Sequence, residues 1–415
     1  MKKIQTWVAF IFILSTFSLY AQEPKVFSPE SVKMSSDSLS KMENYLHGLV
    51  DENRLAGIQT AIIKNNQLIY FNSYGYSDIA NKQRLDEKSI FRIFSMTKPI
   101  VSVALMQQYE QGKFKLNDSL SKYIPEFRES FIYGDSVNTI SKNPIKIVDL
   151  LTHTSGINYG RGMDEGLNAY YQKADLWNSK DNKEFADKLS KVPLQFEPGT
   201  DWAYGMSTNL VGHLVEIFSG MNLRDYLNKF IFQPLEMKST FLHLPKDRID
   251  DFTVGYRWNS EEEQLMEFER PQQSRFLRET ELYNGGGGLL STTMDYSNFC
   301  RMLLNGGKFK NYRIIKKETL DLMFKDHLVE VRKYQERLRL PIGEAGFGLG
   351  FAIKGESSNK LENVFGWGGA VGTYFRVDTD NDLAYILMIQ LSPYRHLRLR
   401  ERFQEFVNSA IISDE

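Results

Sequence analysis

Stretches typical of β-strands lie near both ends of this 415-residue chain, and helical segments fill the middle. Two such stretches, within residues 57–72, flank Asn65-Asn66, and asparagine tolerates the positive φ of a tight hairpin turn. Others lie between residues 346 and 391. Apolar residues at helical spacing predict helices over residues 36–50 and at the C-terminal end. We therefore predict an α/β (α+β) fold in which both chain ends build one antiparallel sheet flanked by these helices.

The middle of the chain, from about 115 to 290, consists mostly of short helical segments and loops. It predicts a mostly helical lobe inserted beside the sheet. No internal repeat or low-complexity linker interrupts the chain, so we expect residues 22–415 to form one two-lobed domain. Within the lobe, the run from Gly285 to Gly288 predicts a loop whose backbone bends sharply or approaches another group closely.

The first 21 residues have the features of a secretory signal peptide. Lys2 and Lys3 precede an apolar run, and Ala21 is a small residue at which a signal peptidase could cut before Gln22. The apolar run is shorter than the roughly 20 residues that span a bilayer. We therefore expect export to the periplasm or the medium without stable membrane insertion of the mature chain. A retained N-terminal anchor is the alternative.

The composition argues against several kinds of partner. Lys plus Arg number 51 and Asp plus Glu 52, a balance that gives no reason to expect a nucleic acid partner. Cys300 is the only cysteine, and its place on a helical face with Tyr296 predicts a buried small apolar side chain. The six histidines show no metal-binding spacing, so we expect neither a metal ion nor another cofactor.

The pattern Ser-x-x-Lys can place a nucleophile beside its proton acceptor, since residues three apart on a helix share one face. It occurs four times, at Ser38/Lys41, Ser95/Lys98, Ser119/Lys122 and Ser357/Lys360. Ser95 lies between an apolar lead-in and an apolar helix predicted from about Ser95 to Gln111, which would hold its first turn rigidly. The other three pairs have polar surroundings, and we interpret them as caps or solvated loops. A Ser95 that merely caps its helix is the structural alternative.

Several further stretches follow Ser95 in a characteristic order. They are "LLTHTSG" at 150–156, "YGM" at 204–206, "GGGGLLST" at 285–292 and "WGG" at 367–369. Together they resemble the serine β-lactamase and penicillin-binding protein superfamily. The resemblance is to its class C β-lactamase-like branch, closest to family VIII carboxylesterases, and covers about 36–410. It implies a β-lactamase/transpeptidase-like fold.

The resemblance implies roles for residues that match the family motifs. Ser95 resembles the acylated nucleophile and Lys98 its helical partner. Tyr204 resembles the tyrosine of a Tyr-x-Asn motif, although Met206 replaces the asparagine. Lys98 and Tyr204 would together take the Ser95 proton and later protonate the leaving group. Because lysine and tyrosine both have reference pKa values of roughly 10, either Lys98 stabilises a Tyr204 phenolate or burial makes Lys98 neutral.

The third motif carries substrate information. Trp367-Gly368-Gly369 lies where the family has Lys-Thr-Gly or His-x-Gly, and Ala370 would supply one oxyanion N–H group and Ser95 the other. A fixed cation helps to bind the carboxylate of a penicillin or of a peptide C-terminus. Trp367 instead offers an apolar face and one N–H donor. The substrate expected is a small-molecule ester or amide, with small uncharged esters favoured.

The sequence thus predicts an exported serine hydrolase working through a Ser95 acyl-enzyme, with carboxylesterase activity favoured. A β-lactamase or D-stereospecific peptidase of the same fold is the alternative. A non-catalytic cell-wall binding protein on this fold is a second one. A Ser-His-Asp hydrolase would need Gly-x-Ser-x-Gly, which is missing, and we interpret His153 as a structural, hydrogen-bonded histidine.

Overall fold

The computed structural model describes most of the chain. The predicted signal peptide, residues 1–21, lies outside the described residues. These are 24–134, 137–162, 164–334, 338–341, 344–357 and 360–412. None of the helices in these ranges combines the length and the apolar character needed to cross a membrane.

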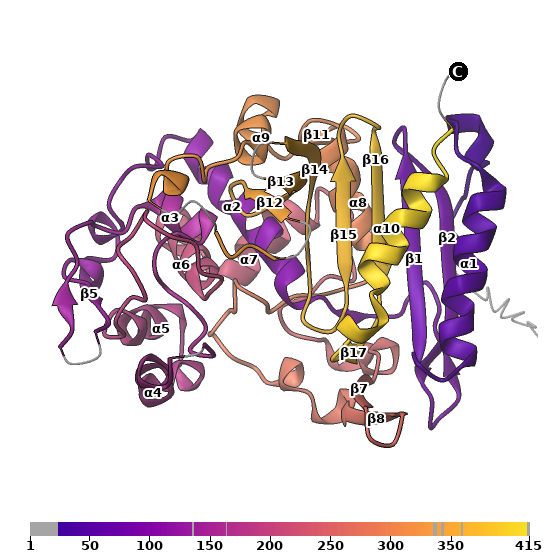
Figure 1. Ribbon diagram of the computed structural model, residues 1–415, viewed down its shortest axis with the longest axis horizontal. Coiled ribbons are helices and arrows are strands. Elements are labelled where there is room, and N and C mark those ends of the chain that lie inside the picture. The colour runs from indigo at the N-terminus through magenta and orange to yellow at the C-terminus, as the bar shows by residue number, and fades with distance from the viewer. Residues whose placement is uncertain are drawn as a thin grey trace, which may run out of the picture.

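The central feature is an eight-stranded sheet with the strand order β12-β13-β14-β15-β16-β1-β2-β3 (Figure 1). Neighbouring strands are antiparallel throughout. Its strands are β12 (Glu344–Phe347), β13 (Ala352–Ser357), β14 (Lys360–Gly368), β15 (Tyr374–Asp378), β16 (Leu383–Met388), β1 (Gly57–Lys64), β2 (Gln67–Asp78) and β3 (Gln83–Arg84). The two chain ends meet between β1 and β16, where Ala61 pairs with Ile386. The prediction of one sheet built from both ends is confirmed.

The local predictions for the sheet and its helices also hold. Asn65 and Asn66 have φ values of 50° and 60° and join β1 to β2, as a tight hairpin requires. Helices α1 (Ser36–Asp51) and α10 (Leu399–Ser409) pack together over one face of the sheet. Helix α8 (Thr293–Leu304) covers the other face, and its Cys300 is fully buried as predicted.

The helical lobe lies beside the sheet, and helix α2 (Thr97–Glu110) stands between them (Figure 1). The lobe contains α3 (Ile147–Thr152), α4 (Glu165–Ala174), α5 (Asn182–Leu189), α6 (Ser207–Ser219) and α7 (Leu223–Leu227). Every apolar residue from Ile100 to Met106 on α2 is fully buried, because sheet and lobe both pack against it. This burial fixes the start of α2, where Ser95 and Lys98 lie.

Short strands complete the fold. β7 (Gly255–Asn259) and β8 (Gln264–Glu269) form a hairpin within the stretch predicted to be mostly helical, and β17 (Leu391–Ser392) pairs with β7. The remaining α-helix is α9 (Lys317–Phe324), and the remaining strands, of two residues each, are β4 (Phe91–Arg92), β5 (Phe131–Ile132), β6 (Thr139–Ile140), β9 (Leu290–Ser291), β10 (Lys308–Phe309) and β11 (Tyr312–Arg313). Pairing of β4 with β9 brings the segment before Ser95 against the segment after the glycine loop.

Candidate active site

Ser95 lies in a short 3₁₀ turn, Phe94–Met96, that leads directly into α2. Phe94 has a φ of 42°, a conformation that costs energy for an aromatic residue and is found mainly where the surrounding structure enforces it. Residues distant in sequence hold the turn in place. The Tyr296 hydroxyl donates to the Met96 carbonyl at 3.0 Å, and the Thr97 hydroxyl accepts the Leu289 N–H at 3.0 Å. The Ser95 side chain is therefore held rigidly while remaining partly exposed.

The other three Ser-x-x-Lys pairs, predicted to be caps or solvated loops, lie in the first turns of a helix, at a 3₁₀ turn and across a hairpin. Ser38 lies on α1, with its backbone N–H in the helix cap. Ser119 precedes a single 3₁₀ turn, and Lys122 forms a surface ion pair. Ser357 ends β13 and pairs across the hairpin with Lys360, the first residue of β14. None of these three pairs stands at the start of a buried helix as Ser95 and Lys98 do.

Lys98 is the centre of the site. Its side chain is 2% exposed, and its ammonium nitrogen has three acceptors. Nζ donates to Ser95 Oγ at 3.3 Å, to the Tyr159 hydroxyl at 2.8 Å and to the Gly286 carbonyl at 2.6 Å. An ammonium group has three donors and no acceptor, so this arrangement satisfies the protonated form completely.

The electrostatics agree with these contacts. Burial by itself lowers the pKa of Lys98, but the attraction of Tyr159 and Tyr204 outweighs it and raises the pKa above its ordinary value. Burial raises the pKa of Tyr159 to about 12, although Lys98 opposes this. The three acceptors around Nζ fit a charged Lys98, with Tyr159 accepting from it as a neutral phenol. Of the two protonation schemes left open by the sequence, these contacts favour the charged lysine.

Tyr204 is a second tyrosine, besides Tyr159, that contacts the Lys98 ammonium. Lys98 Nζ is 4.7 Å from the Tyr204 ring centroid, within the range of a cation–π contact. The indole Nε1 of Trp367 donates to the Tyr204 hydroxyl at 3.0 Å, and the two ring centroids are 5.1 Å apart. Trp367 lies on β14 and Tyr204 just before α6, so this bond ties the sheet to the lobe across the site.

The His153 ring lies behind Tyr204 and is neutral. It is 1% exposed, and burial, helped by Lys98, keeps its pKa well below the ordinary value. Its Nδ1 has no hydrogen-bond partner among the described residues, so the predicted hydrogen bond is not found at that atom. Instead, the rings of Trp202, Tyr204 and Phe347 surround the imidazole edge-on. Aromatic packing accounts for its structural role.

The glycine loop closes the site around Lys98. Besides accepting from Lys98 through its carbonyl, Gly286 donates its N–H to Asn284 Oδ1 at 3.0 Å. That oxygen also accepts from Asn209 on α6 at 3.0 Å. A Cβ at Gly285 would lie 2.8 Å from a backbone oxygen of α6. The predicted close approach of this backbone is confirmed, and glycine is required because the loop packs directly on α6.

The third motif ends β14 and turns beside the segment that carries Ser95. Gly368 is the last residue of the strand, and a Cβ at Gly369 would lie 2.5 Å from the carbonyl oxygen of Ile93. Ile93 is two residues before Ser95, so the motif turn and the Ser95 turn are in contact. Ala370, which follows, is exposed at this edge.

Tyr159 is the site residue that sequence reasoning missed. It lies in the loop after "THTSG", and the bond from Lys98 joins residues 61 positions apart. Its one local signal is the pair of left-handed glycines around it, Gly156 and Gly160, with φ values of 81° and 61°. That signal indicates a sharply bent loop and says nothing about chemistry.

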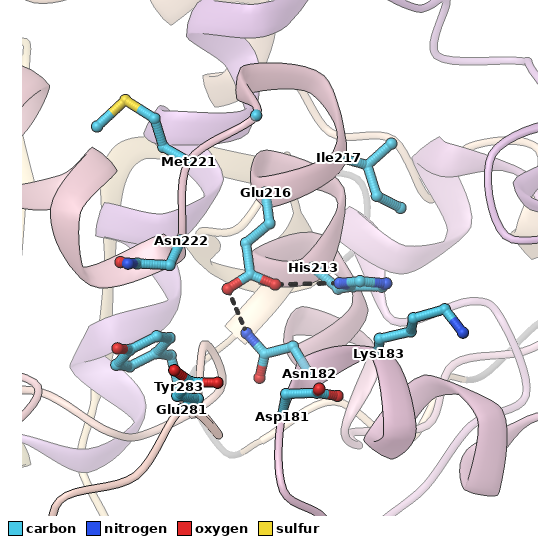
Figure 2. Close-up of a pocket in the computed structure, with 11 residues that line it drawn as sticks. Asp181, Asn182, Lys183, His213, Glu216, Ile217, Met221, Asn222, Glu281 and Tyr283 are labelled. Atoms are coloured by element: carbon cyan, nitrogen blue, oxygen red, sulfur yellow. Dashed lines mark hydrogen bonds and ion pairs between the residues drawn. The ribbon is translucent and has the colours of Figure 1, made fainter.

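The helical lobe holds a separate cavity of about 440 Å³ between α5, α6 and α7 (Figure 2). On its wall, Glu216 accepts from Asn182 at 3.0 Å and contacts His213 Nδ1 at 3.1 Å. Neither Ser95 nor Lys98 lines this cavity. Across the described ranges, no group of three or more His, Cys, Asp or Glu side chains could hold a metal ion.

The fold and the site define the protein as an enzyme of the serine hydrolase class, in which a helix-borne Ser-x-x-Lys pair faces a tyrosine. The chain belongs to the Beta-lactamase family, whose model matches residues 42–407. Both the family and the fold predicted from the sequence are confirmed.

The proteins similar to this chain include one named an esterase. An uncharacterized protein of Mycobacterium tuberculosis is 28% identical over 357 residues, covering 83% of this chain and 88% of that protein. Esterase EstB of Burkholderia gladioli is 27% identical over 221 residues, covering 52% of this chain and 53% of that protein. The solved structure of EstCE1, a hydrolase with promiscuous acyltransferase activity, has a TM-score of 0.75 at 23% identity and covers 89% of this chain and 98% of that one.

Proposed function

We propose that this protein is an exported carboxylesterase that hydrolyses small uncharged esters through an acyl-enzyme on Ser95. The observation that carries the proposal is the hydrogen bond from the buried Lys98 ammonium to Ser95 Oγ, made while the other two ammonium donors are also engaged. A positive donor aimed at Oγ stabilises the alkoxide that attacks a carbonyl carbon.

Because Lys98 is protonated, the proton of Ser95 needs another acceptor, and we assign this role to Tyr204. Negative charge on the Tyr204 oxygen is stabilised by the hydrogen bond from Trp367 and by the Lys98 charge close to its ring. Tyr159 remains a neutral phenol that accepts from Lys98 and fixes its position.

The reaction then follows the usual two halves of acyl transfer. Oγ forms a bond to the ester carbonyl carbon as its proton passes to Tyr204, and the carbonyl oxygen becomes an oxyanion facing the N–H groups of Ser95 and Ala370. Collapse breaks the bond to the alcohol oxygen, which takes the proton from Tyr204. Water then gives a proton to the Tyr204 phenolate and attacks the acyl carbon. Collapse breaks the bond between that carbon and Oγ, and Oγ takes the proton back from Tyr204 as the acid leaves.

The substrate preference rests on Trp367. At the position where a fixed cation would hold the carboxylate of a β-lactam or peptide, the chain has an indole whose N–H is already bonded to Tyr204. A substrate carboxylate placed there would lose its hydration without gaining a charged partner. The esterase name of a relative, EstB, supports the same preference.

The proposal is tested by one hydrolysis panel, run with aryl esters of short-chain acids, a chromogenic cephalosporin and peptides ending in D-Ala-D-Ala. We expect the highest kcat/KM for the aryl esters. Efficient cephalosporin or peptide cleavage without esterase activity would overturn the esterase assignment in favour of the alternative named from the sequence.

Export is a separate part of the proposal and rests on the signal-like first 21 residues. We expect the protein recovered from outside the cytoplasm of a bacterial host to begin at Gln22. N-terminal sequencing of that fraction checks this, and an intact Met1 on protein confined to the cytoplasm would contradict it.

A further inference from the structure

Arg400, the second residue of α10, reaches the turn that follows the third motif. Its Nη2 donates to the carbonyl oxygen of Gly369 at 2.6 Å and to that of Thr373 at 2.7 Å. The same turn is closed by a bond from the Gly369 N–H to the Thr373 carbonyl at 2.8 Å. A single guanidinium nitrogen therefore joins both ends of the turn.

The Gly369 carbonyl and the Ala370 N–H belong to one planar peptide group. A charged donor on the carbonyl oxygen draws electron density toward that oxygen and makes the N–H on the far side more positive. It also fixes the plane of the group and thus the direction of the N–H. We propose that Arg400 is a positioning residue for the oxyanion site, acting through the Gly369–Ala370 peptide. This inference rests on the acyl-enzyme function proposed above.

The surroundings of Arg400 show how the guanidinium is held. A Cβ at Gly368 would overlap it, so the glycine in the motif leaves the space that the guanidinium occupies. The Tyr394 and Tyr374 rings lie 4.4 and 5.4 Å from Arg400 Cζ. Arg400 Nε is fully buried and has no hydrogen-bond partner in the described part of the chain. The geometry therefore allows little movement.

Arg400 is half-buried, and Glu401 attracts its charge without forming an ion pair with it. No carboxylate of the described residues forms an ion pair with it, in contrast to Arg376, which is buried against Glu344 on the same sheet. A half-buried cation that lacks an ion-pair partner is stabilised when further negative charge develops nearby. The oxyanion on the far side of the Gly369–Ala370 peptide supplies such a charge only during the reaction. Stabilisation of that kind lowers the barrier without strengthening substrate binding.

The test uses the full mature enzyme and the variants Arg400→Met and Arg400→Lys. Turnover is measured with 4-nitrophenyl acetate, and the oxyanion site is measured separately as the inhibition constant of phenylboronic acid, whose tetrahedral adduct with a serine places an oxygen at the oxyanion position. For Arg400→Met we expect kcat to fall about tenfold, less than the loss of a direct donor, with KM nearly unchanged. The inhibition constant of the boronic acid should rise by the same factor, and Arg400→Lys should restore part of both.

Arg402→Met is the matched control, because Arg402 lies on the same helix, is about half exposed and, among the described residues, forms a single ion pair, with Glu405 at 3.0 Å. It should change neither quantity. If Arg400→Met does not fold, Arg400→Lys and Arg400→Gln carry the test. A loss of turnover with an unchanged boronic acid constant would show a merely structural role and overturn the inference, as would unchanged turnover. A wild-type enzyme that neither cleaves the ester nor binds the boronic acid would instead overturn the proposed function.

Discussion

Trp367 donates its indole N–H to the hydroxyl oxygen of Tyr204 across 3.0 Å, and this bond connects the sheet to the helical lobe at the catalytic site. The sequence indicated Trp367 as a substrate-facing residue in the place of a cation. The structure gives it a second task, which is to hold the tyrosine that we assign as the proton acceptor. One side chain, Trp367, therefore both stands in the place of the cation and holds the tyrosine.

Replacing Trp367 by Phe should lower kcat about tenfold, because the ring is kept while a hydrogen bond to developing negative charge is lost. Trp202→Phe is the matched control. Trp202 also packs on Tyr204, with ring centroids 6.2 Å apart, but its Nε1 has no partner within the described residues. The measurement is kcat for ester hydrolysis by both variants. Equal losses of kcat would show that only the ring contact with Tyr204 is important.

Trp367→Lys should shift substrate preference away from uncharged esters and toward β-lactams. A lysine at this position offers the charge that the carboxylate of a cephalosporin or penicillin needs. We expect the ratio of kcat/KM for a chromogenic cephalosporin to that for an aryl ester to rise. A ratio that stays constant in a folded variant would mean that the third motif does not select the substrate.

Ser95→Ala should abolish labelling by a fluorophosphonate and ester turnover while leaving the melting temperature nearly unchanged, because the side chain is small and partly exposed. Ser38→Ala, Ser119→Ala and Ser357→Ala are the controls and should keep turnover within about threefold. A binding protein on this fold would not be labelled in the first place. Activity that survives in Ser95→Ala and is lost in a control would reassign the nucleophile.

Lys98→Ala and Tyr204→Phe should each reduce kcat by at least about 10², the lower end of general-base contributions. The double variant should lose far less than the product of the two, because the cation and the phenol act on one proton. Tyr159→Phe should have a smaller effect, since it removes one of three ammonium contacts and leaves Lys98 bonded to Ser95. Steady-state kinetics on all four variants test this, and fully multiplicative losses would separate Lys98 from Tyr204.

Local patterns predicted the parts of the molecule that depend on neighbours in sequence. The Asn65-Asn66 hairpin, helix α1 and the Ser95–Lys98 spacing are of this kind, since turn chemistry and helical periodicity act over a few residues. The β7–β8 hairpin was not predicted, although Tyr256–Asn259 and Met266–Glu269 alternate apolar and polar residues, because each alternation covers only four residues and most of β8 is exposed.

Contacts between distant segments were not predictable in the same way. The Trp367–Tyr204 bond joins residues 163 positions apart, and the Arg400–Gly369 bond joins a helix to a strand end. Resemblance to a family indicated that Tyr204 and the third motif belong to one site, but it gave no partner for either side chain. Such pairs depend on how the sheet and the lobe pack, which only the folded chain determines.

Asp149 lies in the first turn of α3, close to the site. It makes the free energy of unfolding depend on pH. Its carboxylate accepts from the Lys146 N–H at 2.8 Å and from the Thr154 hydroxyl at 3.0 Å. Burial nevertheless raises its pKa to about 6. The unfolded value is about 3.9, so the folded chain keeps a proton that the unfolded chain releases between about pH 4 and 6. The contribution of Asp149 to stability is thus complete below about pH 4 and is lost as the pH rises through about 6.

The amide of an Asp149→Asn variant would not titrate. The free energy of unfolding of the wild type minus that of this variant should therefore shrink from about pH 4 to 7. The expected change is about 3 kcal/mol, the equivalent of about two pKa units. Urea unfolding at several pH values measures it. Asp118→Asn is a control of opposite sign: the hydrogen bond from Tyr123 lowers the pKa of Asp118 to about 2, so its contribution is lost as the pH falls toward that value. A difference that grows from about pH 4 to 7 for Asp149→Asn would mean that the ionised carboxylate, satisfied by Lys146 and Thr154, stabilises the fold.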